Sequence, residues 1–313
     1  MILTGIGDEG ANSIDGQIQS TRDLGWKVIE MRGVEVPGFS KANLHDIPDA
    51  AFDLVMRKLE QSGVGIYCFG STIMNWAKTV ETPFEVTLAE VKRAIPRMKR
   101  LSTKYVRVMS FKPDDEDYKI PTQVFQRVRE VTNMFLDAGF QPVHENCMNY
   151  GGMSWQHALE LLDKVPGLKW VFDTANPIFN ADRSKPKPWP KQDPWEYWTH
   201  LREHVAHIHI KDATWSNAKN DADYNWPGEG QGRVHDILKD ALARGYDAGI
   251  SIEPHMVVVF HDANSKANDE SIRANFIEYG RRMEKMIAGI KAELAKRPGA
   301  AATGATRTQA GVV

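Results

Sequence analysis

The chain has 313 residues, of which 42% are hydrophobic and 26% charged, and this is the composition of an ordinary globular protein. Its formal net charge of −2 lacks the basic excess that attracts nucleic acid or an anionic membrane. No signal peptide is recognisable, no apolar run approaches the roughly 20 residues of a membrane helix, and two cysteines are too few for a disulfide framework, so we expect a cytoplasmic enzyme.

Eight short apolar runs rich in β-forming residues recur along the chain. We predict strands at Ile2–Ile6, Lys27–Met31, Val64–Phe69, Tyr105–Ser110, Gln141–Glu145, Lys169–Asp173, Ala206–Ile210 and Gly249–Glu253. Segments with helical spacing are predicted at Pro48–Ser62, Glu85–Leu101, Gln123–Ala138, Ser154–Val165, Trp195–Val205, Val234–Ala243 and Ile272–Leu294. The alternation predicts an α/β fold, a closed (β/α)8 TIM barrel formed as a single domain by residues 1–297. Residues 298–313 are rich in Ala, Gly and Thr and are predicted to form a flexible tail.

Two connections after predicted strands are long, Pro177–Pro194 and Ala213–Arg233. Loops after the strands build the active-site face of a barrel, and Trp215 and Trp226 favour a wall that contacts substrate. The alternative is that these tryptophans only anchor the loop. A glycine-rich run at residues 228–232 suits a phosphate cradle or close passage of the loop beside a metal, and we favour the latter.

Four successive strands end in residue types that bind metals, namely Glu145, Asp173, His209 and Glu253. A single such carboxylate is usually a solvated loop residue or a helix cap. Four of these residues would converge on one face of a closed barrel, where buried carboxylates need a metal or a charged partner. We therefore predict that these four residues bind one divalent metal ion. Three carboxylates and one imidazole suit Mn2+ (preferred), Mg2+, Co2+ or Fe2+, and Zn2+ remains compatible.

Several residues near these ligands are candidates for moving a proton. His144 is the preferred base because histidine titrates near neutral pH, but strand alternation turns it away unless the strand end is kinked; otherwise it packs outward. Glu145, Glu253 and His255 are the other candidates. His207 lies deeper on the strand of the histidine ligand and is expected to pack or to support that ligand.

We expect the substrate to contact residues beside the ligands and in the following loops: Asn149, Asn176, Lys211, Trp215, Trp226 and His255. Lys211 lies just beyond the ligand histidine on the same face of its strand. A solvated loop position is the alternative for Lys211 and for His255.

The arrangement resembles the xylose isomerase-like superfamily of sugar isomerases and epimerases. The resemblance covers roughly residues 1–294 and is carried by the four strand-end ligands, by His-Ile-His-Ile-Lys-Asp at 207–212 and by Pro-Gly-Glu-Gly at 227–230. It implies a metal-dependent enzyme acting on a sugar. One departure is Asn176, which stands where ketose 3-epimerases of this family usually carry a histidine.

The run His-Glu-Asn-Cys-Met-Asn-Tyr-Gly-Gly-Met at 144–153 is similar to the large (alpha) subunit of bacterial C-glycoside deglycosidases. That resemblance implies a divalent metal, a small β-rich partner subunit in a hetero-oligomer, and a lyase acting on 3-oxo-glucosides of flavonoids and related aromatics. It also implies that His144 is the base. Removal of the acidic C2 proton would give an enolate that expels the aglycone, whereas reprotonation on the other face would give epimerisation.

Three alternatives compete with the lyase. An isomerase or epimerase on a free ketose, inosose or sugar phosphate would act alone. A phosphodiesterase of the AP-endonuclease type should show a basic stripe and more metal-binding histidines, which the near-neutral charge disfavours. A non-catalytic sugar-binding barrel is disfavoured because converging carboxylates are costly unless they are used.

Overall fold

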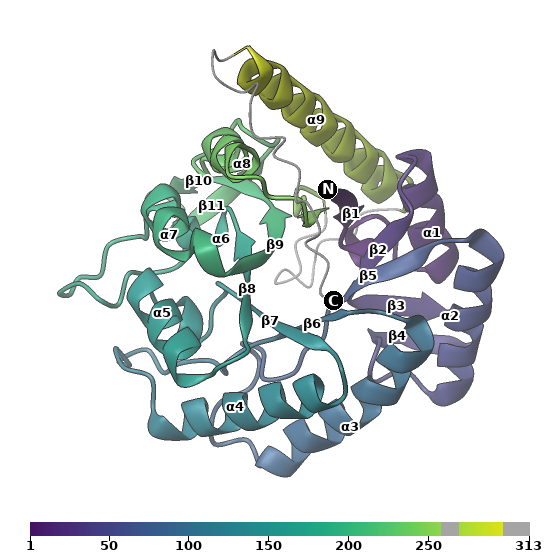
Figure 1. The fold of residues 1–313 in the computed structure, drawn as a ribbon, viewed down its shortest axis with the longest axis horizontal. Coiled ribbons are helices and arrows are strands. Elements are labelled where there is room, and N and C mark those ends of the chain that lie inside the picture. The colour runs from purple at the N-terminus through teal and green to yellow at the C-terminus, as the bar shows by residue number, and fades with distance from the viewer. Residues whose placement is uncertain (258–268, 297–313) are drawn as a thin grey trace, which may run out of the picture.

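The computed structural model describes residues 1–257 and 269–296. Eight parallel strands form one sheet in the order β1-β12-β9-β8-β7-β6-β5-β2. Their bounds are β1 (Ile2–Gly5), β2 (Val28–Met31), β5 (Gly65–Phe69), β6 (Tyr105–Val108), β7 (Gln141–Glu145), β8 (Lys169–Asp173), β9 (Val205–Ile210) and β12 (Gly249–Ile252). A parallel bridge between Ile6 and Glu30 joins the two ends of this sheet, so the strands close into a barrel (Figure 1). The predicted (β/α)8 barrel and its eight strands are confirmed.

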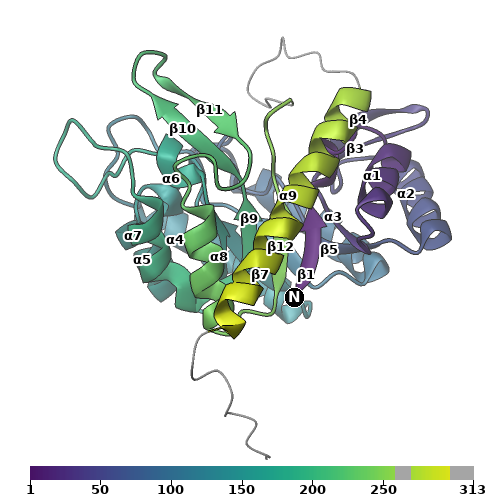
Figure 2. The same ribbon diagram turned by 90° about the horizontal axis from the view of Figure 1, so that it is seen from above.

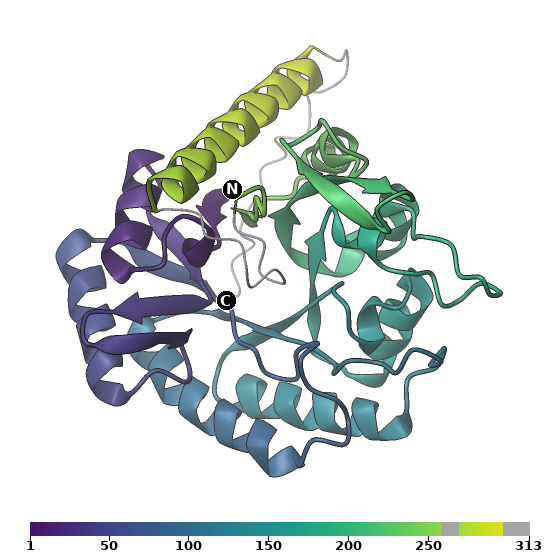
Figure 3. The ribbon, with the colours of Figure 1, turned by 180° about the vertical axis from the view of Figure 1, so that it is seen from behind.

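Helices surround the barrel. They are α1 (Ile14–Asp23), α2 (Asp49–Ser62), α3 (Phe84–Leu101), α4 (Thr122–Asp137), α5 (Trp155–Lys164), α6 (Asn176–Phe179), α7 (Pro194–Leu201), α8 (Val234–Ala243) and α9 (Asp269–Ala295), with short 3-10 turns η1 (Gly7–Glu9), η2 (Tyr150–Gly152) and η3 (Arg202–His204). The long helix α9 lies against α1 and α8 and so covers the seam between the first and last strands (Figures 1 and 3). Within residues 1–257 and 269–296, no helix has the length and apolar character that a membrane span requires. The predicted tail at 298–313 lies outside the described residues.

The local sequence explains where several helices begin and end. The Ser154 hydroxyl accepts a hydrogen bond from the His157 backbone N–H and so caps the start of α5. The Asp193 carboxylate caps α7 in the same way, and Pro194 occupies the first helical position, where its missing N–H costs nothing. Helix α2 ends at Ser62, and the following Gly63 has a φ of 68°, a left-handed conformation that glycine adopts without strain.

Alternation along the strands divides their side chains between two environments. On β9, Ile208 and Ile210 face the helices and belong to the main apolar core, whereas His207 and His209 point into the barrel. The rings of Tyr67 and Tyr105, 5.4 Å apart, pack with small apolar residues of the barrel interior. The interior therefore changes from apolar side chains at the starts of the strands to charged side chains at their C-terminal ends.

Two hairpins extend this C-terminal face. The strands β3 (Gly33–Val36) and β4 (Phe39–Asn43) follow β2, and β10 (Asp212–Ser216) and β11 (Asp221–Asn225) follow β9. Figure 2 shows both hairpins at the same end of the barrel. Neither hairpin was predicted, and the second lies in a segment expected to be a loop. Its strands are short and mostly polar, so they lack the apolar run on which strand prediction depends.

Candidate metal centre and pocket

The four predicted ligands converge at the C-terminal end of the barrel. Glu145 ends β7, Asp173 ends β8, His209 lies on β9 and Glu253 follows β12, and their ligand atoms all lie within 4.8 Å of one another. All four side chains are buried. This proximity agrees with the prediction from the strand ends and places three carboxylates and one imidazole around a common point.

The spacing around His209 suits a shared metal ion better than hydrogen bonds. Its Nδ1 lies 3.8 Å from Glu145 Oε1 and 3.7 Å from Glu253 Oε2. These distances exceed those of hydrogen bonds but approach the roughly 3.4 Å that separates two ligands each about 2.1 Å from one ion. Among the described residues this buried Nδ1 has no hydrogen-bond partner. An orphaned imidazole nitrogen facing carboxylates therefore fits a metal ligand.

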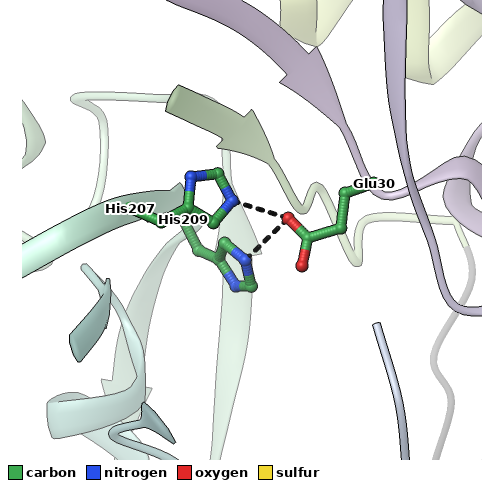
Figure 4. Close-up of side chains that lie close together, drawn as sticks. All are labelled: Glu30, His207 and His209. Atoms are coloured by element: carbon green, nitrogen blue, oxygen red, sulfur yellow. Dashed lines mark hydrogen bonds and ion pairs between the residues drawn. The ribbon is translucent and has the colours of Figure 1, made fainter. Parts of the chain in front are cut away.

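The other ring nitrogen of His209 is held by Glu30, a residue that the sequence analysis missed. Glu30 is fully buried on β2, and its Oε2 lies 3.0 Å from His209 Nε2 and 2.7 Å from His207 Nε2 (Figure 4). The sequence does contain an indication of this residue, because the Glu30 carboxylate interrupts the apolar strand Val-Ile-Glu-Met at an inward-facing position. His207 packs beneath the ligand histidine, as expected.

Asp173 divides its two oxygens between a helix cap and the cluster. Oδ1 accepts hydrogen bonds from the backbone N–H groups of Ala175 and Asn176 at the start of α6, at 2.9 and 2.7 Å. Oδ2 lies 3.1 Å from the Lys211 ammonium. Burial raises the pKa of Asp173 to about 7, although Lys211 opposes the shift. The cap interpretation and the ligand interpretation of this residue are therefore compatible.

Three fixed cations border the carboxylates. Arg107 Nη1 donates to Glu145 Oε2 at 2.8 Å, Arg32 Nη1 donates to Glu253 Oε1 at 3.2 Å, and Lys211 Nζ lies 3.2 Å from Glu253 Oε2. Burial alone would raise the pKa of Glu145, but Arg107 and His209 outweigh it and lower the value to about 2. Neither arginine was predicted, although Arg107 interrupts an apolar strand, as Glu30 does.

The fixed cations do not balance the buried acids of this region. Buried carboxylates outnumber the arginines and the lysine; they are Asp8, Glu9, Glu30, Glu145, Asp173 and Glu253. A cluster of buried negative charges is costly unless a cation compensates it. The excess of buried negative charge and the spacing around His209 both favour a bound cation, and a divalent ion fits the three carboxylates and one imidazole.

Glu145 and Glu253 lie on the floor of a cavity of about 550 Å³. Its walls carry aromatic and apolar side chains from several loops: Trp76, Met148, Phe179, Trp215 and Tyr224. Trp76 and Met148 are exposed at 38% and 49%, so apolar surface is open to solvent at the rim. The pocket thus combines a charged floor with an apolar rim.

His144 is not in this pocket. It lies on the outer face of β7, where its ring stacks on Trp170 with centroids 4.7 Å apart and its Nε2 lies 2.9 Å from Ser110 Oγ. The strand pairs in regular register through Glu145, so the kink that would turn His144 inward is absent. Burial lowers the pKa of His144 to about 3. The prediction that His144 reaches the substrate as a base is therefore wrong, because strand alternation prevails.

His255 does line the pocket. Its Nε2 lies 3.7 Å from Glu253 Oε1, and its Nδ1 lies 2.5 Å from Glu9 Oε1. The backbone φ of 51° is unusual for a residue with a side chain, and such conformations concentrate at functional sites. Glu9 was not predicted; it lies in a short turn directly after the first strand.

The remaining predicted substrate contacts divide into two groups. Asn176, Lys211 and Trp215 line the pocket, and Asn176 Nδ2 donates to Glu145 Oε1 at 3.0 Å. Asn149 does not line it, because its amide holds the loop after β7 through Ser110 and backbone groups. Trp226 packs on Tyr279 and under Arg282 of α9 and is not among the residues that line the pocket, which agrees with the anchor interpretation.

The glycine-rich run wraps a protein carboxylate. Asp212 accepts backbone hydrogen bonds from Gly228, Gly230 and Gly232 at 2.8 to 3.0 Å, and one from Ala213. A Cβ at Gly230 would lie 2.4 Å from Asp212 Oδ1, so a side chain would not fit there. These N–H groups are therefore committed to Asp212 rather than to a phosphate.

The family model described as xylose isomerase-like TIM barrel matches residues 18–278. The chain belongs to this family. No curated protein sequence matches it.

Solved structures share the fold at low sequence identity. The probable 3-DHS dehydratase of petrobactin synthesis from Bacillus anthracis superposes with a TM-score of 0.64 at 16% identity, over 88% of this chain and 97% of that one. D-psicose 3-epimerase with D-tagatose from Clostridium cellulolyticum H10 superposes with a TM-score of 0.62 at 14% identity, over 92% of this chain and 99% of that one. A xylose isomerase-like TIM barrel protein from Mycobacterium smegmatis in complex with magnesium superposes with a TM-score of 0.60 at 16% identity, over 92% of this chain and 97% of that one. At these identities the likeness shows the fold alone.

Proposed function

We propose that this protein is a divalent-metal-dependent enzyme that removes a proton from a keto sugar to form an enolate. The metal would be held by Glu145, Asp173, His209 and Glu253. The observation that carries the proposal is the buried His209 Nδ1, which faces carboxylates at 3.7 and 3.8 Å on the floor of an open pocket. The M. smegmatis relative, described with magnesium, supports the choice of a divalent ion.

The residues of the pocket divide the chemistry among them. A bound divalent ion supplies Lewis-acid polarisation of a sugar carbonyl. His255 is the base that the geometry favours, because it lines the pocket and is oriented by Glu9. Glu145 and Glu253 are less suited, since Arg107, Arg32 and Lys211 hold both in ion pairs. Arg107 and Lys211 are positioned to bind sugar oxygens.

The preferred substrate within this proposal is a 3-oxo-glucoside of an aromatic aglycone. Its C2–H is acidified by the C3 carbonyl; the base takes this proton, and the electron pair forms the enolate. The C1–aglycone bond then breaks as a C1–C2 double bond forms and the C3 carbonyl is restored, and the aglycone atom takes up a proton. Trp76, Trp215 and Tyr224 on the pocket wall support an aromatic aglycone, because flat rings stack on such side chains.

An isomerase or epimerase acting on a free ketose, an inosose or a sugar phosphate is the second candidate. The same enolate, reprotonated on its other face, gives an epimer. The fold likeness to D-psicose 3-epimerase favours this candidate. Asn176, which stands near Glu145 where those epimerases usually have a histidine, favours the lyase.

Turnover assays with two substrates test the proposal. The Mn2+-loaded protein is incubated with 3-oxo-puerarin, a 3-oxo-C-glucoside, and separately with D-tagatose, and products are separated by chromatography. Chelator-sensitive release of the aglycone supports the lyase, and epimerised ketose supports the second candidate. Because a small β-rich partner subunit is also proposed, the assay is repeated with a small protein encoded beside this one. Metal-independent turnover, or none of either substrate in any arm, contradicts the proposal.

A further inference from the structure

We infer that Glu30 is a positioning residue that fixes the ring of His209 so that Nδ1, and not Nε2, is presented to the metal. This inference rests on the metal centre of the proposed function but not on the identity of the substrate. It concerns a residue beneath the four ligands that does not itself line the pocket.

Glu30 reaches both barrel histidines with one oxygen. It is fully buried on β2, across the barrel from β9, and its Oε2 lies 2.7 Å from His207 Nε2 and 3.0 Å from His209 Nε2. In Figure 4 the two imidazole rings converge on this oxygen. The carboxylate therefore restrains the His209 ring from the side opposite the predicted metal position.

The cluster of Glu30, His207 and His209 is not a second metal site. Two ligands about 2.1 Å from one ion at a tetrahedral angle lie about 3.4 Å apart, and the 2.7 Å between Glu30 and His207 is much shorter. His207 Nδ1 lies 3.0 Å from the carbonyl oxygen of Gly249, which can only accept a hydrogen bond. The short contacts are therefore hydrogen bonds. Because His207 Nδ1–H already donates to Gly249, the 2.7 Å contact shares one further proton between His207 Nε2 and Glu30 Oε2, and His209 Nε2–H donates to the same oxygen.

This assignment determines which atom of His209 can bind metal. When Nε2–H donates to Glu30, the lone pair of the neutral ring resides on Nδ1, which faces Glu145 and Glu253. A carboxylate behind a ligand histidine fixes the tautomer and the ring orientation and makes the ring a stronger donor to the metal. Without Glu30, the proton could occupy Nδ1, and metal binding would first have to displace it.

Metal affinity tests the inference without any substrate. Free Mn2+ is measured by electron paramagnetic resonance during titration of the wild type, Glu30→Gln and Glu30→Ala. We expect the dissociation constant to rise by about 10-fold in Glu30→Gln and by about 100-fold in Glu30→Ala. Asp182→Asn is the control, because Asp182 is a buried carboxylate outside the four ligands and the Glu30 contacts, where it accepts hydrogen bonds from Ser184, and this change should leave Mn2+ affinity unchanged.

Nuclear magnetic resonance of 15N-histidine protein loaded with diamagnetic Zn2+ supplies a readout that a packing role would not move. In the wild type, His209 should carry its proton on Nε2, and that proton signal should be lost or shifted in Glu30→Ala. If both Glu30 variants bind Mn2+ like the wild type and keep the His209 signals, the inference is wrong. If the wild type itself binds no Mn2+, the metal centre of the proposed function is wrong instead.

Discussion

His255 Nδ1 lies 2.5 Å from Glu9 Oε1, and the backbone N–H of His255 donates to the other oxygen of the same carboxylate at 2.7 Å. Two contacts from one glutamate hold a residue whose φ is 51°. The opposite nitrogen of the ring is thereby directed toward Glu253 at the floor of the pocket. This arrangement resembles a base oriented by a carboxylate, and it replaces the role that the sequence suggested for His144.

Replacing His255 should therefore separate catalysis from metal binding. We expect His255→Asn to lower kcat by about 100-fold to 10,000-fold, the range for loss of a general base, while one divalent ion per chain is retained. Glu9→Gln should lower kcat less, because the ring remains but its orientation is weakened. His200→Asn, at a surface histidine stacked on Trp155, is the control. Unchanged kcat in His255→Asn would exclude this residue as the base.

Lys211 places its ammonium between two of the predicted ligands, 3.1 Å from Asp173 Oδ2 and 3.2 Å from Glu253 Oε2. In Lys211→Met the metal-free carboxylates lose this neighbouring cation and repel one another more strongly. We expect a lower Tm in chelator and a larger rise of Tm on addition of Mn2+ than in the wild type. Lys219→Met removes an exposed lysine paired with Asp223 and should leave the Mn2+ effect as it is. An equal Mn2+ effect in all three proteins would show that Lys211 does not compensate the ligands.

His144 should govern acid stability and not turnover. Its folded-state pKa of about 3 lies below the roughly 6.5 of an unfolded histidine, so the unfolded chain binds the extra proton and stability falls as pH drops from about 6.5 toward 3. Between pH 7.5 and 5.0 the wild type should lose about 2 kcal/mol of unfolding free energy more than His144→Gln, which cannot titrate. Urea unfolding at the two pH values measures this difference. A large loss of kcat in His144→Gln would restore it as a catalytic candidate.

Asp212 should hold the wall of the pocket in place. Its carboxylate accepts four backbone hydrogen bonds, and the hairpin that begins at Asp212 carries Trp215 and Tyr224. Asp212→Ala leaves those N–H groups without their acceptor, and we expect a loss of about 3 kcal/mol of unfolding free energy and a raised KM for glycosides. Asp223→Ala, at an exposed position of the same hairpin, is the matched control. Equal stability of the two variants would contradict this role.

The sequence predicted the barrel because short runs rich in apolar, β-forming residues alternate with helical patterns, and it predicted the ligands because parallel strands end on one face. Glu30 and Arg107 could have been found by the same alternation rule, since each is a charged residue at an inward-facing position of an apolar strand. Glu9 could not, because it lies in a turn whose direction the sequence leaves open. The burial of Trp226 depends on contact with Tyr279, which lies 53 positions further along the chain, and no local pattern reports such a contact.

The most direct test of the account is elemental analysis of the purified protein before and after chelation, with Glu253→Gln alongside. We predict about one Mn, Mg, Co, Fe or Zn ion per wild-type chain, removable by chelator, and much less in Glu253→Gln at an unchanged circular dichroism spectrum. No metal in the wild type after incubation with these ions, or equal metal in the variant, would contradict the claim that this cluster is a metal centre.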